Sequence, residues 1–349
     1  MGKMDCGEDG GSRLAKVPRS RAEEVRKGLK RVGSVRKDRK IVEDGDYVLI
    51  PLNQGFDTMK MEEMGIEVVE GDTDSRCCYR SPMERIIDKI ELEDWALPFL
   101  PRKWERVGDI LIMRFPKEIA QLKIQVAKTY AEVLEAKTVC EDLRGISGVY
   151  RLPSVEVILG TDTETIHYEN GVHFMMDVKR VMFSSGNVDE RLRMGNIDCS
   201  GETVVDMFAG IGYFTLPLAV HGNPHNVIAC EINRDAQHYL EKNLELNGVE
   251  SVVEIFGGDN RDLPLSQVAD RVIMGYVGTG EFLEKGIDLV KPGGIVHYHD
   301  TAPVDQVGLL EAFVLKAAKE RGAEIISLRE VKSYAPAVSH FVVDFKVLR

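Results

Sequence analysis

The sequence predicts an α/β protein with a Rossmann-like parallel sheet in its C-terminal part and smaller α+β domains before it. First, a buried apolar run at 204–206 leads into a turn with Gly210 and Gly212, and helical spacing resumes over 213–221. Second, strand and helix patterns alternate from there onward, as in parallel sheets. Third, the chain closes with a strand, a turn and a strand, which predicts an antiparallel hairpin at the sheet edge.

The glycine turn and the next two strand ends predict an adenosine site. Glycine lets a ligand approach the backbone, and the N–H groups of the following helix point at that ligand. The strand at 226–231 ends in Glu231, about 20 residues after the glycines, where a carboxylate accepts hydrogen bonds from ribose hydroxyls. The strand at 252–256 precedes Asp259 and Asn260, which can read an adenine edge. The third glycine of the dinucleotide fingerprint is missing, which favours S-adenosylmethionine over NAD.

Length and composition set broader limits. The chain has 349 residues, 44% of them hydrophobic, enough for two or three domains. No apolar run reaches the ~20 residues that span a bilayer, and the N-terminus lacks a signal-peptide core, so we expect a soluble, cytoplasmic protein. The sequence does not fix the oligomeric state, for which we expect a monomer. The cysteines lack metal-ligand spacing, which predicts reduced, mostly buried thiols and no metal site. They are Cys6, Cys77, Cys78, Cys140, Cys199 and Cys230.

The charge is unevenly distributed. The net charge is −12, but residues 13–40 hold twelve Lys or Arg against three acidic residues, so this segment carries 12 − 3 = +9 and the remaining chain −21. A basic segment of this kind can contact RNA phosphates even on an acidic protein. It can equally be a solvated basic helix, and charge alone does not separate the two interpretations.

The N-terminal part is expected to hold a disordered tail at 1–19, a small basic α+β domain at 20–75 and a linker at 76–103. The expected elements are a helix, a strand, a helix followed by a strand, and a further helix, at 20–31, 47–52, 61–70 and 83–90.

A second α+β domain is expected at 104–187, followed by the Rossmann-like domain at 188–349. The second domain should contain a strand, a long amphipathic helix and three more strands, at 107–114, 116–134, 155–159, 164–168 and 172–176. The dipeptide Asn170-Gly171 is a strong hairpin signal between the last two.

Several motifs together resemble one known family, the archaeal tRNA wybutosine-synthesising enzyme 2 family, which is related to the tRNA guanine-N1 methyltransferases. They are Phe-Ser-Ser-Gly-Asn at 183–187, Val-Asp-Met-Phe-Ala-Gly-Ile-Gly-Tyr-Phe at 205–214, Gly-Asp-Asn-Arg at 258–261, Asp-Arg-Val-Ile-Met-Gly-Tyr-Val at 270–277 and His-Tyr-His at 297–299. The resemblance extends over 104–349 and is weaker over 20–75. It implies the class I S-adenosylmethionine-dependent Rossmann-like methyltransferase fold.

The resemblance also implies an activity: transfer of the 3-amino-3-carboxypropyl group from S-adenosylmethionine to the 4-demethylwyosine base 3′ of the anticodon in phenylalanine tRNA. The sulfonium has three electrophilic carbons, so the carbon held in line with the nucleophile decides the product. Family resemblance implies that Ser184 and Arg191 contact the cofactor, Arg191 as a charge-assisted clamp on its carboxylate. Phe208 and Gly210 would line the loop under the methionine part.

The end of the fourth strand of the predicted sheet departs from the methyltransferase pattern. The relatives have an amide or carboxylate and a proline there, whereas this chain has Met-Gly-Tyr-Val at 274–277, which favours altered chemistry. Tyr276 would stack on the flipped-out base or pack as a core aromatic. His297 and His299 are candidates for a base that removes the proton after alkylation, or they are structural histidines, or positioning alone suffices.

Two other functions remain open from the sequence. A close relative would transfer the methyl group to tRNA and release S-adenosylhomocysteine instead of methylthioadenosine. A non-catalytic tRNA-binding module would bind the cofactor without turnover, although intact Glu231, Asp259 and Asn260 argue against it.

Overall fold

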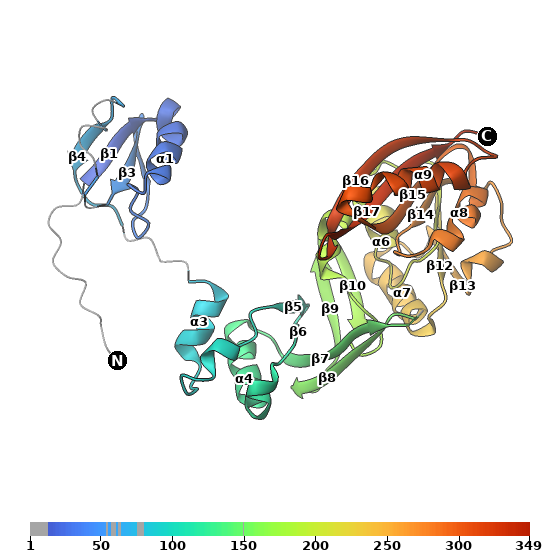
Figure 1. Cartoon of the computed structure of the whole chain (residues 1–349), viewed down its shortest axis with the longest axis horizontal. Helices are drawn as coiled ribbons and strands as arrows, with labels where there is room; N and C mark the ends of the chain where they lie inside the picture. Colours follow the sequence, from blue (N-terminus) through green and yellow to red (C-terminus); the bar gives the residue numbers. More distant parts are fainter. Residues whose placement is uncertain (1–12, 54, 57–60, 62–63, 75–79, 149) are drawn as a thin grey trace. The chain divides into compact units, whose positions relative to one another are not determined.

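The computed structural model describes residues 13–53, 55–56, 61, 64–74, 80–148 and 150–349 (Figure 1). The chain divides into two compact units, Met1–Glu84 and Arg85–Arg349. In the described residues, no helix is both long enough and apolar enough to cross a membrane. Three cysteines in this part, Cys140, Cys199 and Cys230, are free and buried, and the other three lie outside the described residues.

The first unit contains a four-stranded antiparallel sheet in the order β2-β3-β1-β4 and the helix α1 (Ala22–Arg31). Its core contains Val25 and Leu29 from the apolar face of that helix. The helix at 22–31 and the strand at 47–52 agree with the predicted elements, whereas the short strand at 42–44 between them was not predicted. The bounds are β1 Arg13–Pro18, α1 Ala22–Arg31, β2 Val42–Asp44, β3 Tyr47–Leu52 and β4 Glu67–Glu70.

The predicted disordered tail at 1–19 is wrong for its last residues. Strand β1 is central in the sheet and pairs with β3 on one side and β4 on the other. Leu14, Ala15 and Val17 are buried, and this burial stabilises the strand although basic residues alternate with them. Residues 1–12 lie outside the described residues.

The second unit contains a four-stranded sheet in the order β5-β6-β7-β8, which helix α3 precedes along the chain. The bounds are α3 Pro82–Lys89, β5 Trp104–Val107, β6 Ile110–Met113, α4 Lys123–Val133, β7 Thr138–Ser147 and β8 Leu152–Leu159. The predicted strand at 107–114 is confirmed at 110–113 as β6, but it begins later than expected, because Gly108 at φ +55° turns the chain and Val107 belongs to the preceding strand β5. Strand β7 was not predicted; it buries the polar residues Thr138 and Glu141 and exposes Leu143 and Ile146, so it lacks a regular alternation of apolar and polar residues.

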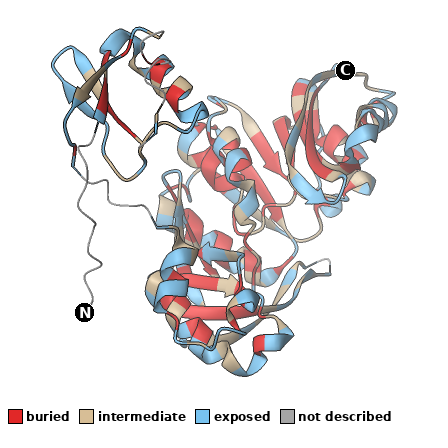
Figure 2. Ribbon diagram, turned by 60° about the vertical axis from the view of Figure 1, so that its left-hand side comes forward, coloured by how far each residue is buried: buried red, intermediate tan, exposed pale blue. Residues whose placement is uncertain are grey.

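The large sheet has seven strands in the order β13-β12-β11-β14-β15-β17-β16. Neighbouring strands from β13 to β15 are parallel, and β17 and β16 are antiparallel, which confirms the predicted Rossmann-like methyltransferase fold. Figure 2 shows buried residues concentrated on the strands of this sheet. The bounds are β11 Thr203–Asp206, α6 Thr215–His221, β12 Asn226–Glu231, α7 Arg234–Asn247, β13 Val253–Gly257, β14 Ala269–Met274, α8 Leu283–Leu289, β15 Val290–Pro303, α9 Gly308–Ala317, β16 Ala323–Ala335 and β17 Val338–Val347.

A separate hairpin, β9 (Glu164–Glu169) and β10 (Val172–Asp177), packs on the Rossmann-like domain. The side chain of Asn243 on α7 accepts a hydrogen bond from the Met175 N–H at 2.6 Å and donates to the Met175 carbonyl at 3.1 Å. Phe174 and Met176 belong to the same buried cluster as the β11 residue Val204. The hairpin and helix α5 (Val188–Gly195) therefore hold the segment 178–187 beside the large sheet.

Candidate active site

A cavity of about 460 Å³ lies at the carboxyl ends of strands β11, β12, β13 and β14. In this fold class, ligands bind at that edge of the sheet. The cavity is lined by the candidate base-stacking residue Tyr276 and by every cofactor-binding residue expected from the sequence. The latter are Ser184, Arg191, Phe208, Gly210, Glu231, Asp259 and Asn260.

The glycine turn is fixed to the end of β12. Gly210 has φ +59°, and a Cβ on it would collide with the Tyr213 ring, so only glycine fits. The Gly210 N–H donates to Glu231 Oε2 at 2.7 Å, and the Asn233 N–H donates to Glu231 Oε1 at 2.7 Å. Burial raises the pKa of Glu231. Each carboxylate oxygen keeps further acceptor capacity for a ligand hydroxyl.

Asp206, at the end of β11, holds the start of the same turn. It is fully buried, and it accepts hydrogen bonds from Thr215 Oγ1 at 2.8 Å and from the Phe208 N–H at 3.1 Å. Burial raises the pKa of Asp206 to about 6. Asp206 was not among the residues predicted from the sequence, although its place directly before the glycine turn indicates a role in holding that turn.

Asn260 and Asp259 differ in whether their side-chain oxygens already have partners within the protein. Asn260 is buried and donates from Nδ2 to the Met207 carbonyl at 2.8 Å, while its Oδ1 has no hydrogen-bond partner among the described residues. Asp259 forms an ion pair with Arg261 at 2.6 Å and caps the turn at 260–262. An unpartnered buried acceptor is costly, so Asn260 Oδ1 is suited to accept a hydrogen bond from a ligand.

Aromatic rings line the middle of the cavity. The Phe208 ring lies 5.7 Å from the Tyr276 ring and 5.3 Å from the Phe282 ring. The guanidinium of Arg151 lies 5.2 Å from the centre of the Tyr276 ring, a cation–π arrangement. A Cβ on Gly275 would collide with the Phe214 ring, so the unusual glycine of the 274–277 motif makes room for that ring.

Arg191 and Lys332 form a cationic group in the lining of the same cavity. Arg191 is buried, binds Glu169 with two hydrogen bonds of 2.6 and 2.7 Å, and donates to the Ser184 carbonyl at 2.7 Å. Lys332 donates to Ser184 Oγ at 3.0 Å, and burial together with Arg191 lowers the pKa of Lys332. Neither Lys332 nor Arg151 was expected from the sequence, and Lys332 lies 148 residues after its partner serine.

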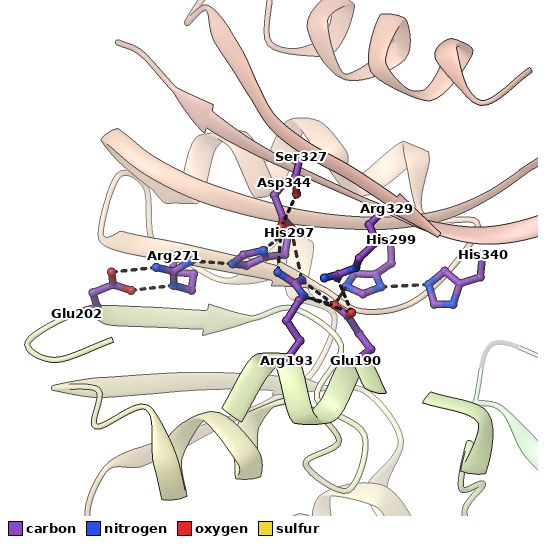
Figure 3. A network of polar contacts seen from close by, with 10 residues as sticks. All are labelled: Glu190, Arg193, Glu202, Arg271, His297, His299, Ser327, Arg329, His340 and Asp344. Carbon is purple, nitrogen blue, oxygen red and sulfur yellow. Dashed lines mark hydrogen bonds and ion pairs between the residues drawn. The ribbon is translucent and has the colours of Figure 1, made fainter. Parts of the chain in front are cut away.

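The candidate bases His297 and His299 lie behind the cavity and do not line it. His297 contacts Asp344 Oδ1 through Nδ1 at 2.5 Å and the Arg271 guanidinium through Nε2 at 2.8 Å (Figure 3). His299 contacts His340 at 3.0 Å. Because side chains alternate along β15, both histidines lie on the same face of this strand. That face points to α5 and not to the cavity. The structure favours the structural interpretation for His297.

The side chains around these histidines form a charge-balanced network, in which Glu190, Arg271 and Asp344 are buried (Figure 3). Three acidic residues pair with three arginines, so the histidines can stay neutral without leaving a charge uncompensated. Burial lowers the pKa of His297 and His299, and it lowers that of His340 to about 4. The ion-paired residues are Glu190, Glu202, Asp344, Arg193, Arg271 and Arg329.

Comparison with known proteins identifies the family. The tRNA(Phe) (4-demethylwyosine(37)-C(7)) aminocarboxypropyltransferase of Pyrococcus horikoshii is 41% identical over 273 residues, which cover 77% of this chain and 97% of the relative. The model of the TRM5/TYW2 methyltransferase domain matches residues 165–326. The chain belongs to the TRM5/TYW2 family. The TYW2 N-terminal domain model matches residues 83–163, and the N-terminal domain model of tRNA methyltransferase 5 matches 16–60.

Two solved structures extend this family assignment. The Pyrococcus horikoshii TYW2 structure in complex with MeSAdo has a TM-score of 0.68 and 38% identity, and covers 76% of this chain and 99% of that chain. The Trm5b structure from Pyrococcus abyssi has a TM-score of 0.71 and 32% identity, and covers 97% of this chain and all of that chain. This TRM5/TYW2 chain therefore resembles TYW2 in its second unit and Trm5b along its full length.

The neutral histidines predict how stability depends on pH. A buried histidine with a lowered pKa stays neutral in the folded state at pH values where the unfolded chain is already protonated. Below pH 6.5 the unfolded state therefore binds more protons, and the free energy of unfolding decreases as the pH decreases. For His340 this loss continues down to a pH of about 4. We expect His340→Gln to remove about 1.4 kcal/mol per pH unit from this dependence. Urea unfolding at several pH values between 7 and 5 measures it, and an unchanged dependence would contradict the assignment of a neutral His340.

Proposed function

We propose that this chain transfers the 3-amino-3-carboxypropyl group of S-adenosylmethionine to C7 of 4-demethylwyosine, 3′ of the anticodon in phenylalanine tRNA. The carrying observation is one cavity that is lined both by Glu231 and Asn260, which suit an adenosine, and by the cationic side chains of Lys332 and Arg191. Relatives with this named activity are 41% and 40% identical to this chain. A cytoplasmic location and a monomeric state belong to the same proposal.

The residues that suit an adenosine fit the cofactor. Glu231 keeps acceptor capacity for the ribose hydroxyls, and the unpartnered Oδ1 of Asn260 is an acceptor for the adenine amino group. Gly210 leaves its surface open because no Cβ projects there. The bound cofactor supplies an electrophilic carbon on its sulfonium.

The cationic residues of the cavity determine which of the carbons bonded to the sulfonium reacts. Lys332 and Arg191 offer positive charge to the carboxylate of the aminocarboxypropyl group, and Ser184 lies between them. Arg191 keeps its two hydrogen bonds to Glu169, which fix the guanidinium in place. Holding that carboxylate aims the aminocarboxypropyl carbon, and not the methyl carbon, at the acceptor base.

Tyr276 supplies a stacking surface for the acceptor base between Phe208 and Arg151. We expect Tyr276→Ala to weaken tRNA binding by about 1–3 kcal/mol, because a base–aromatic stack is lost. Tyr276→Phe keeps the ring and should bind tRNA nearly as tightly as the wild type. Filter binding with the cofactor product present measures both. Equal affinities for the Ala and Phe variants would contradict the stacking role.

The first unit contributes phosphate contacts in this proposal. Lys30 and Arg31 are exposed at the end of α1, while other basic residues of 13–40 pair with carboxylates, as Arg39 does with Asp72 at 2.9 Å. We expect Lys30→Glu combined with Arg31→Glu to weaken tRNA binding and reduce its salt slope by about 2, with cofactor affinity unchanged.

A matched control for this charge reversal is available. Lys316→Glu combined with Lys319→Glu changes the charge equally, on exposed residues at the end of α9. The control should keep the wild-type salt slope. If both double variants change the slope equally, the effect is one of net charge and the assigned contact surface is wrong.

Methyl transfer to tRNA remains a second candidate, favoured by one observation. The tRNA (guanine(37)-N(1))-methyltransferase Trm5b of Pyrococcus abyssi is 34% identical over 95% of this chain, including the first unit. Chromatography of the cofactor product separates the two reactions. Methylthioadenosine marks aminocarboxypropyl transfer, and S-adenosylhomocysteine marks methyl transfer.

A further inference from the structure

His340 connects the network around His297 and His299 with the wall of the cavity. It lies on β17, is almost fully buried, and lines the cavity. Its direct cross-strand partner on β16 is Lys332, which lines the same cavity. His340 is therefore the one histidine among the described residues that both lines this cavity and contacts the interior network.

A row of three side chains leads inward from the cavity (Figure 3). His340 Nε2 lies 3.0 Å from His299 Nδ1. His299 Nε2 points to Glu190, 3.6 Å from Oε1, and has no hydrogen-bond partner in the described part of the chain. Glu190 is buried and is held by Arg193 and Arg329, each at 2.6 Å.

The acceptor at the inner end fixes the protonation of the row. An ionised carboxylate only accepts, so the hydrogen of neutral His299 belongs on Nε2, which faces Glu190. His299 Nδ1 then accepts, and His340 must donate from Nε2. The remaining nitrogen of His340, Nδ1, carries a lone pair and is left for a ligand in the cavity.

We propose that His340 removes the proton that the acceptor carbon loses after alkylation, and that His299 passes it to Glu190. This inference rests on the proposed function. The acceptor nucleobase supplies the electron pair of the new carbon–carbon bond, and the pair of the broken carbon–sulfur bond stays on sulfur. The C7–H bond then breaks, its pair returns to the ring, and its proton goes to His340 Nδ1. The Nε2 protons of His340 and His299 move one step inward, and Glu190 becomes a neutral carboxyl group.

The surrounding charges suit this direction of transfer. Burial lowers the pKa of His299 and His340, helped by Lys332 at His340 and by Arg193 and His297 at His299, so neither ring retains the proton. Asp300 at His340 and Asp344 at His299 act in the opposite sense. Burial raises the pKa of Glu190, which makes its carboxylate the better acceptor at the inner end.

The resting protein offers a test that needs no substrate. Nitrogen-15 NMR of the full chain labelled at histidine distinguishes the two neutral ring forms. We expect both His299 and His340 to carry hydrogen on Nε2, with His299→Gln and His340→Gln assigning the signals. Hydrogen on Nδ1 of His340 would overturn the proposal, because that nitrogen could not then accept a proton from the cavity.

The second test follows the proton itself in single turnovers, with tRNA carrying hydrogen or deuterium at C7 of 4-demethylwyosine. We expect His340→Gln to slow the transfer about 100-fold and to show a primary isotope effect larger than that of the wild type, with cofactor affinity unchanged. His299→Gln, which interrupts the row one step further in, should behave alike. His297→Gln is the matched control, equally buried but outside the row, and should keep the wild-type isotope effect.

The outcomes separate this inference from the proposed function. A wild-type rate in both His340→Gln and His299→Gln overturns the proton path. Slower transfer without an enlarged isotope effect also overturns it, because the histidines then act only through structure. Transfer of a methyl group by the wild type, in contrast, overturns the proposed function.

Discussion

Replacing Arg193 with methionine should lower the free energy of unfolding by about 3–5 kcal/mol, because two buried carboxylates lose their shared partner. Arg193 donates to Glu190 at 2.6 Å and to Asp344 at 2.9 Å. Both carboxylates are more than nine-tenths buried, so neither can recover its solvation from water. Methionine fills much of the same volume and leaves the charge as the main change.

Urea unfolding at neutral pH measures this loss, with Arg180→Met as the control. Arg180 also contacts two carboxylates, Asp177 and Asp235, but its side chain is 59% exposed. Exposed ion pairs contribute about 0–1 kcal/mol, so the control should change little. Equal losses in the two variants would show that the network beside α5 is no more important for stability than a surface pair.

Replacing Glu231 with glutamine should weaken S-adenosylmethionine binding by about 100-fold or more, since hydrogen bonds to a charged group contribute about 1.5–3 kcal/mol each. The amide has one acceptor oxygen where the carboxylate has two, and its NH₂ group would face a backbone N–H of Gly210 or Asn233. The variant therefore loses the ribose contacts and loosens the glycine turn together.

Calorimetric titration with the cofactor measures the loss, and Glu241→Gln on the exposed face of α7 is the matched control. Burial raises the pKa of Glu231, so wild-type affinity should also weaken at acid pH as this carboxylate takes up a proton. The glutamine variant lacks this dependence. Wild-type affinity in Glu231→Gln would remove Glu231 from the cofactor site.

That Gly210, Glu231 and Asn260 line one cavity was predictable, because these residues follow consecutive parallel strands. Carboxyl ends of parallel strands meet at one edge of the sheet, so the order along the chain already places Gly210, Glu231 and Asn260 together. Residue type then restricts the chemistry, because few side chains other than a carboxylate suit ribose hydroxyls. Local patterns were sufficient for this half of the site.

The remaining lining residues, Lys332, His340 and Arg151, were not predictable from local patterns. Lys332 and His340 reach the cavity from the antiparallel pair β16–β17, whose pairing register no local signal specifies. Arg151 comes from the turn before β8, at φ +53°. The alternation of side chains along a strand places His297 and His299 on the same face of β15, but it does not indicate whether that face meets the cavity. Strand β1 was missed because buried Leu14 and Val17 alternate with basic residues that resemble a disordered tail.

The most direct test of the proposed activity uses S-adenosylmethionine labelled separately in the methyl and the carboxylate carbon, with phenylalanine tRNA that carries 4-demethylwyosine. We expect carboxylate label in the tRNA and methyl label in methylthioadenosine. Methyl label in the tRNA, with S-adenosylhomocysteine as the product, would contradict the account and make this chain a tRNA methyltransferase.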